Sequence, residues 1–167
     1  MNGITRIFWT LLLPVAAIAA PREEPLFEPE RAFRPSARLV AGHAASSERH
    51  GIDVEFAIAP GYYLYRDRLR FEVVPATLLL GPPELPPGEA KEDVFVGKAT
   101  IFRDRVVIHL PFTASVVRPG AYRLRLVAQG CAEDRFCYSP FTQELPLNIP
   151  PGYRMTDSPS PLPGPRR

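Results

Sequence analysis

The sequence predicts an all-β fold of the antiparallel sandwich class. Apolar residues recur at every second position in several segments, which is the period of a half-buried strand. Turn sequences rich in proline and glycine separate these segments at short intervals. Nowhere do ten consecutive residues show the apolar spacing of an amphipathic helix. Short alternating strands with frequent turns are typical of a β-sandwich.

Seven segments are predicted strands. In chain order they are Ala37–Val40, Ile52–Ile58, Leu69–Val73, Lys98–Phe102, Val106–Phe112, Tyr122–Gln129 and Thr142–Leu147. An antibody-type domain has a buried tryptophan and a disulfide that joins its two sheets over a long loop. Neither is predicted here, because Trp9 is the chain's only tryptophan and lies near the N-terminus. The term immunoglobulin-like therefore describes the expected architecture only.

Residues 1–20 have the pattern of a secretory signal peptide. Arg6 gives a positive start, the segment Ile7–Ile18 is apolar, and Ala17-Ile18-Ala19 fits a small-residue cleavage site. The apolar run is shorter than the roughly 20 residues that a membrane-spanning helix needs. We expect cleavage after Ala19 or Ala20 and a periplasmic location for the mature chain.

The rest of the chain divides into three predicted parts. Residues 21–26 form a charged, proline-rich lead-in, residues 27–149 form one folded domain, and residues 150–167 form a flexible proline-rich tail. The chain has 20 basic and 18 acidic residues, for a net charge of +2. So small a charge gives no electrostatic surface for nucleic acid.

Both cysteines lie in the stretch QGCAEDRFCYSP, residues 129–140. In an oxidising compartment a disulfide is the default. The predicted strand Tyr122–Gln129 leads into Cys131, a loop covers Ala132–Phe136, and Cys137 begins the return strand, so the two cysteines face each other across a hairpin. A bond closing so short a ring stabilises by only about 2.4 kcal/mol. From spacing alone, a structural staple and a reversible redox pair remain equally open.

A metal site is the third alternative, and it needs three or four ligands. The chain has three histidines, His43, His50 and His109. His43 and His50 fall in a loop rich in small residues, and His109 alternates within a predicted strand. Each is better explained as a packed or solvated side chain, so the sequence predicts no metal and no other cofactor. It also contains no hydrolase motif.

Three segments in this order resemble one known family. They are PGYYLYRDRLRFE (60–72), LPPGEAKEDVFVGKATIFRDRVVIHLPF (85–112) and QGCAEDRFCYSP (129–140). Together they resemble the N-terminal periplasmic domain of the bacterial thiol:disulfide interchange protein DsbD. The resemblance implies an immunoglobulin-like sandwich with a redox-active cysteine hairpin and a cap loop. It implies that Cys131 and Cys137 exchange, with Cys137 bonding to partners.

The resemblance also assigns residues around the cysteine pair. Asp93–Gly97 matches the cap loop, with Phe95 as the aromatic that shields the sulfurs and Gly97 as a flexible end. Asp93 is implied to tune or relay a proton. Tyr63 and Tyr65 match aromatics of the same region. Two departures from the family pattern are Val94, where a second acid is common, and Val96, where an aromatic is common.

The leading hypothesis is a periplasmic thiol–disulfide exchange protein, a protein-disulfide reductase component. The resemblance implies a thioredoxin-like electron donor and client thiol proteins such as disulfide isomerases or cytochrome c maturation proteins. Because the chain ends at Arg167, the donor is expected in trans, and a separate membrane electron carrier fits the same scheme. The main rival is a non-catalytic binding or assembly module with a structural disulfide. A copper-binding protein is a weaker rival, since no Met or His cluster lies near the cysteines.

Overall fold

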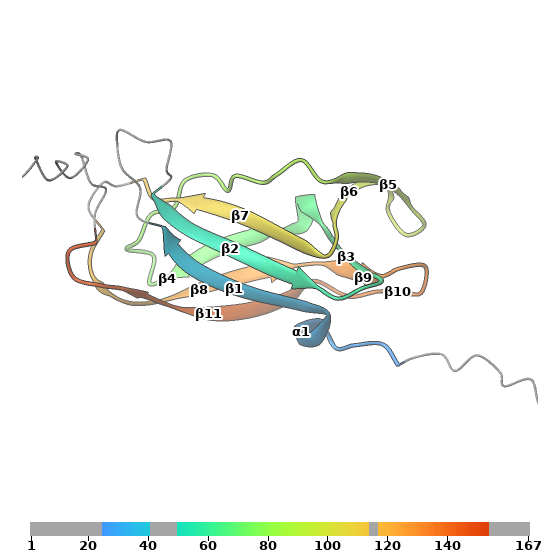
Figure 1. The fold of residues 1–167 in the computed structure, drawn as a ribbon, viewed down its shortest axis with the longest axis horizontal. Helices are drawn as coiled ribbons and strands as arrows, with labels where there is room; N and C mark the ends of the chain where they lie inside the picture. The colour runs from blue at the N-terminus through green and yellow to red at the C-terminus, as the bar shows by residue number, and fades with distance from the viewer. Residues whose placement is uncertain (1–24, 41–49, 114–116, 154–167) are drawn as a thin grey trace, which may run out of the picture.

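Nearly every element in the described part of the chain is a β-strand (Figure 1). The computed structural model describes residues 25–40, 50–113 and 117–153. Its elements are α1 (Pro29–Ala32), β1 (Phe33–Val40), β2 (Gly51–Ile58), β3 (Tyr62–Tyr65), the 3-10 turn η1 (Arg66–Arg68), β4 (Arg70–Val74), β5 (Glu89–Asp93), β6 (Gly97–Phe102), β7 (Arg105–Pro111), β8 (Gly120–Ala128), β9 (Gly130–Ala132), β10 (Phe136–Cys137) and β11 (Phe141–Ile149).

Two three-stranded antiparallel sheets form the sandwich. One has the order β1-β2-β7 and the other the order β11-β8-β4. Alternate residues of each sheet point inward, as the period-two pattern predicts. The core draws on both sheets, with Ile52, Val54 and Phe56 of β2, Ile108 and Leu110 of β7, Leu124 and Leu126 of β8, and Leu147 and Ile149 of β11. This confirms the predicted all-β, immunoglobulin-like sandwich.

A third sheet, with the order β10-β9-β3-β6-β5, lies at one end of the sandwich (Figure 1). We call it the end sheet. Three of its strands continue directly from or into sandwich strands: β2 turns at Gly61 into β3, β6 leads into β7, and β8 leads into β9. Gly61 adopts a φ of +78°, a left-handed conformation that favours glycine. The end sheet carries both cysteines and is therefore fixed in place by the sandwich core.

All seven predicted strands are present, with shifted ends. β1 begins at Phe33, four positions before the predicted Ala37, and the predicted strand over 122–129 ends at Ala128. Four short strands of the end sheet fall outside these seven: β3 and β5 were not predicted, and β9 and β10 form the predicted cysteine hairpin. The predicted loop Ala132–Phe136 is shorter in the structure, because Ala132 belongs to β9 and Phe136 to β10.

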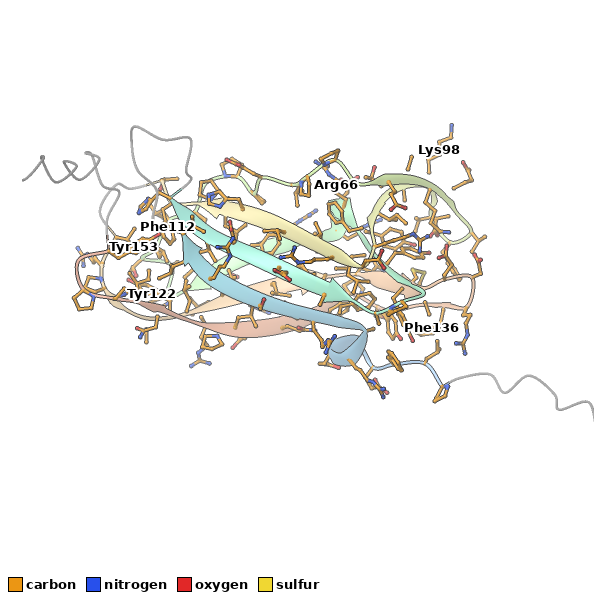
Figure 2. The ribbon with its side chains drawn as sticks, viewed as in Figure 1. Arg66, Lys98, Phe112, Tyr122, Phe136 and Tyr153 are labelled. Atoms are coloured by element: carbon orange, nitrogen blue, oxygen red, sulfur yellow. A yellow bond between two sulfur atoms is a disulfide. The ribbon has the colours of Figure 1, made fainter. Side chains whose placement is uncertain are left out.

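The predicted signal peptide and His43 lie outside the described residues, as does most of the tail. Tyr153, assigned to the tail, is buried, and its hydroxyl donates a hydrogen bond to the carbonyl of Val40. Its ring stacks on His50, so the packed chain extends beyond residue 149. Figure 2 shows Tyr153 and Phe136 at opposite ends of the molecule. Within the described ranges, the structure has no helix with the length and apolar character needed to cross a membrane.

Candidate functional site

The two cysteines form a disulfide between the neighbouring strands β9 and β10. Cys131 and Cys137 are directly paired in the strand register, with Cα atoms 4.0 Å apart. The turn between them is Glu133–Arg135, in which Asp134 adopts a φ of +54°. Cys131 has no exposed surface, whereas Cys137 is partly exposed. Of the two cysteines, only Cys137 therefore has surface that solvent reaches.

Close packing fixes the position of Cys131. β9 pairs with β3, so Tyr63 lies opposite Cys131 and Leu64 lies opposite Gly130. A Cβ atom on Gly130 would lie 2.4 Å from the Tyr63 carbonyl oxygen and 2.6 Å from Cζ of Phe33. Glycine is therefore required here by the close approach of β9 to β3. Gly130, the residue before the first cysteine, is therefore needed for the packing of the site.

The hydroxyl of Tyr65 lies against both sulfurs. Its oxygen is 3.2 Å from Sγ of Cys131 and 3.6 Å from Sγ of Cys137. A disulfide sulfur has no proton, so the Tyr65 hydroxyl is the donor. Burial, followed by a hydrogen bond to Asp93, raises the pKa of Tyr65 to about 12. Tyr65 therefore stays protonated at neutral pH. Because it has one proton, it donates either to the Asp93 carboxylate or to a sulfur, and not to both at once.

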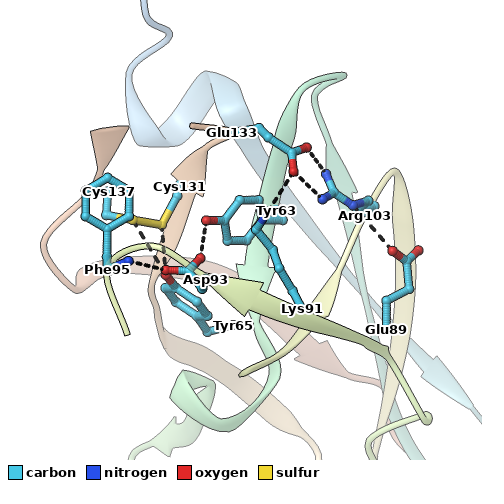
Figure 3. A network of polar contacts seen from close by, with 10 residues as sticks. All are labelled: Tyr63, Tyr65, Glu89, Lys91, Asp93, Phe95, Arg103, Cys131, Glu133 and Cys137. Atoms are coloured by element: carbon cyan, nitrogen blue, oxygen red, sulfur yellow. Dashed lines mark hydrogen bonds and ion pairs between the residues drawn. A yellow bond between two sulfur atoms is a disulfide. The ribbon is translucent and has the colours of Figure 1, made fainter. Parts of the chain in front are cut away.

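Asp93 is buried at the end of β5, with only 3% of its surface exposed. One carboxylate oxygen accepts a hydrogen bond from the Tyr63 hydroxyl (Figure 3). The other accepts the backbone N–H groups of Phe95 and Val96, at 2.8 and 3.1 Å. Burial raises the pKa of Asp93, but the hydrogen bonds from Tyr63, Phe95, Tyr65 and Val96 together outweigh burial and lower it. Asp93 is thus a carboxylate that orders the cap loop.

The cap loop is the short turn Val94–Val96 between β5 and β6. Asp93 pairs with Gly97 across its base, and Gly97 adopts a φ of +76°. A three-residue hairpin loop with a glycine in this conformation is a common turn type. Phe95 is 52% exposed, so it is not a core aromatic, and its ring points toward the disulfide in Figure 3. Val94 and Val96 are also exposed.

A cluster of ion pairs joins the cysteine turn to the hairpin that carries the cap loop (Figure 3). The carboxylate of Glu133 accepts a hydrogen bond from Nζ of Lys91 at 2.8 Å. It also accepts hydrogen bonds from both terminal nitrogens of Arg103, one of them at 2.7 Å. Arg103 also contacts Glu89 at 3.4 Å. Hydrogen bonds from Arg103 and then Lys91 lower the pKa of Glu133 to about 2. Glu133 is therefore ionised throughout the physiological range.

The structure brings every sequence-predicted site residue to the end sheet or its cap loop. These are Cys131, Cys137, Asp93, Phe95, Gly97, Tyr63 and Tyr65. Sequence reasoning missed Lys91, Arg103 and the packing role of Gly130. It also missed that Glu133 is paired with these two cations. Among the residues that the structure describes, no three His, Cys, Asp or Glu side chains cluster as a metal site.

The fold and the site define an immunoglobulin-like domain with a disulfide in its end sheet, packed against Tyr63 and Tyr65. Residues 23–149 match the sequence profile of the family described as "Thiol:disulfide interchange protein DsbD, N-terminal". The chain belongs to this family, which is periplasmic and part of a thiol–disulfide interchange protein.

Two curated relatives illustrate the similarity. The DsbD protein of Cronobacter sakazakii is 45% identical over 101 residues, which is 60% of this chain and 17% of that protein. The DsbD protein of Neisseria meningitidis serogroup A is 32% identical over 161 residues, which is 96% of this chain and 25% of that protein. The chain thus spans a quarter or less of the length of these relatives.

Solved structures agree with the sequence comparison. The reduced DsbD N-terminal domain of Neisseria meningitidis superposes with a TM-score of 0.61 and 36% identity, covering 74% of this chain and 90% of that one. The same Neisseria domain in complex with the PilB N-terminal domain gives a TM-score of 0.55 and 36% identity, over 74% and 88% of the two chains.

Proposed function

We propose that this protein exchanges disulfides in the periplasm through a reversible Cys131–Cys137 bond. The observation that supports this most directly is the unequal exposure of the two bonded cysteines, of which Cys131 is fully buried and Cys137 is partly exposed. A staple needs no such arrangement, and it would gain more stability from closing a longer loop. A partly exposed cysteine and a hydroxyl donor beside both sulfurs are parts that exchange needs.

The proposed reaction is a pair of thiol–disulfide exchanges. A thiolate of a reduced donor attacks Sγ of Cys137, the bond to Cys131 breaks, and Cys131 leaves as a thiolate next to the Tyr65 hydroxyl. The donor's second thiolate then attacks the mixed disulfide and releases Cys137, so the donor leaves oxidised and this protein keeps two thiols. The reduced pair transfers its two electrons to a client disulfide by the same steps in reverse.

The proposed donor is a thioredoxin-like protein acting in trans, and the proposed clients are periplasmic thiol proteins. The Neisseria domain forms a complex with the PilB N-terminal domain, which is a precedent for a complex between a domain of this family and another protein domain. Disulfide isomerases and cytochrome c maturation proteins are the client classes implied by the family resemblance. A separate membrane electron carrier would supply the donor.

The disulfide is expected to have a reduction potential above about −300 mV, the region below which structural disulfides typically lie. The measurement is equilibration of the purified protein in dithiothreitol or glutathione buffers, with alkylation and intact mass to count free thiols. A potential clearly below this value would favour the non-catalytic module with a structural disulfide and would reject exchange.

Phe95→Ala is expected to speed the reaction of the disulfide with small thiols several-fold, because we propose that its side chain shields the sulfurs. Its stability cost is expected to stay below about 1 kcal/mol, far less than the roughly 3–5 kcal/mol of a core phenylalanine, since half of the side chain is already exposed. Val94→Ala, in the same turn and 75% exposed, is the control. Equal rates in the two variants would remove the shielding role of Phe95.

A further inference from the structure

The charged cluster behind the cysteine pair has no part in the exchange steps above, although it is built from partly buried side chains. Lys91 has 17% of its side chain exposed, Arg103 has 26% and Glu133 has 33%. Long charged side chains at a protein surface normally stay hydrated, and an isolated exposed ion pair contributes little. Here one carboxylate holds two cations from a different hairpin, which is a specific arrangement.

One aromatic ring separates the cluster from the cysteine pair. Nζ of Lys91 lies 5.2 Å from the centroid of the Tyr63 ring, and Cζ of Arg103 lies 5.4 Å from it. Tyr63 is 1% exposed and packs with Cys131, to which it is paired in the β3–β9 register. The region between the cations and the sulfurs is therefore closely packed, and charges there are poorly screened by water.

The positive and negative charges of this region nearly cancel, and Glu133 supplies part of the negative charge. The ionisable groups around the pair come from two strands and two loops: Tyr63 and Tyr65 of β3, Lys91 and Asp93 of β5, Arg103 after β6, and Glu133 and Arg135 of the turn. Glu89 adds a more exposed negative charge beside Arg103. With Glu133 in place, one of the two cations facing Tyr63 is neutralised. Without it, both would act on the sulfurs.

We propose that the carboxylate of Glu133 offsets the positive charge of Lys91 and Arg103 behind Tyr63 and so limits how readily the reduced cysteine pair ionises. The proposal rests on the exchange function above, because an ionised thiol is the attacking species in exchange. Nearby positive charge favours the thiolate and nearby negative charge disfavours it. Removal of the anion and removal of a cation should consequently have opposite effects.

The test is the pH dependence of iodoacetamide alkylation in the fully reduced protein. Its midpoint reports the pKa of the accessible thiol, and its high-pH plateau reports access past the cap loop. Glu133→Gln is expected to lower the thiol pKa, raising the thiolate fraction below that pKa by about threefold to tenfold. Lys91→Met is expected to lower this fraction by a similar factor. The double variant, which removes one charge of each sign, is expected to return close to the unchanged protein.

A merely structural clamp would behave differently, because both single variants would loosen the cysteine turn and the double variant would not recover. Shifts of the same sign, or no recovery in the double variant, would overturn the proposal. Glu55→Gln is the matched control, since Glu55 holds Arg105 through two bonds of 2.7 Å in the sheet β1-β2-β7; it is expected to leave the thiol pKa unchanged.

Two properties of the experiment keep its outcome clear. If Glu133→Gln does not fold, as judged by circular dichroism, Lys91→Met alone still tests the sign of the effect. The measured thiol pKa is also independent of the reduction potential that tests the exchange function. A disulfide with a potential below about −300 mV would reject exchange whatever the variants do, whereas a suitable potential with unshifted thiol pKa values would reject only the role of Glu133.

Discussion

Cys131→Ser is expected to turn this protein into a trap that accumulates a mixed disulfide with a thioredoxin-like partner, whereas Cys137→Ser is expected to accumulate almost none. In the first variant Cys137 keeps its partly exposed position and bonds to the partner, but no second sulfur is available to release it. In the second variant the remaining sulfur, on Cys131, has no exposed surface. The partner must lack its own resolving cysteine, since that thiol would otherwise break the trapped bond.

Non-reducing gels of the two variants, mixed with the same partner, are the measurement. Dithiothreitol should release the partner from the captured species, which would show that a disulfide links the two proteins. The Cys131→Ser/Cys137→Ser double variant is the control for non-covalent association and should give no band. Equal capture by both single variants would remove the distinct roles of the two cysteines, and capture through Cys131 alone would reverse them.

Burial is the property that separates the two sulfurs, and it was not available from the sequence. The sequence offers charge instead, with Glu133 after Cys131 and Arg135 before Cys137. In the structure Glu133 is neutralised by Lys91 and Arg103, so its charge does not act on Cys131 alone. The assignment of Cys137 as the sulfur that bonds to partners came from the family resemblance, and it stays a prediction that the partial exposure of Cys137 supports.

The strands whose buried and exposed residues alternate were predicted, whereas β3 and β5, which lack this alternation, were missed. β2 and β8 have one face in the core, so their pattern of period two is plain. β3 is buried at all four positions, which leaves no alternation to detect. β5 has the sequence EAKED and lies at the edge of the end sheet. Charged residues are rare in strands except at such edges.

The cysteines and the cap loop were identified from local motifs, but the contacts around them were not. Tyr65 is 66 positions from Cys131, and Lys91 is 42 positions from Glu133. Such pairs meet only because β3, β9 and the β5–β6 hairpin share one sheet. A sequence without a predicted strand at β3 or β5 cannot place these side chains together, so the charged cluster could be found only from the structure.

Gly130→Ala is expected to destabilise the fold by about 3 kcal/mol, at the upper end of the usual cost of overpacking. The added Cβ would lie 2.4 Å from a backbone oxygen of Tyr63, which cannot rotate away. It would also lie 2.6 Å from Cζ of Phe33, which has no exposed surface and packs against the rings of Tyr62, Tyr138 and Phe141. Both neighbours are fixed, so β9 must move away from β3.

That movement would carry Cys131 away from Tyr63 and Tyr65, so the same variant should lose stability and expose the disulfide together. Guanidinium unfolding of the oxidised protein measures the first effect, and the rate of reduction by a small thiol measures the second. Gly81→Ala is the control, because its nearest neighbour, at 3.1 Å, is the ring atom Cγ of Pro111; its cost is expected to stay within about 1 kcal/mol. Equal stability of the two variants would mean that β9 shifts on β3 without cost and that the sandwich does not hold Cys131 in place.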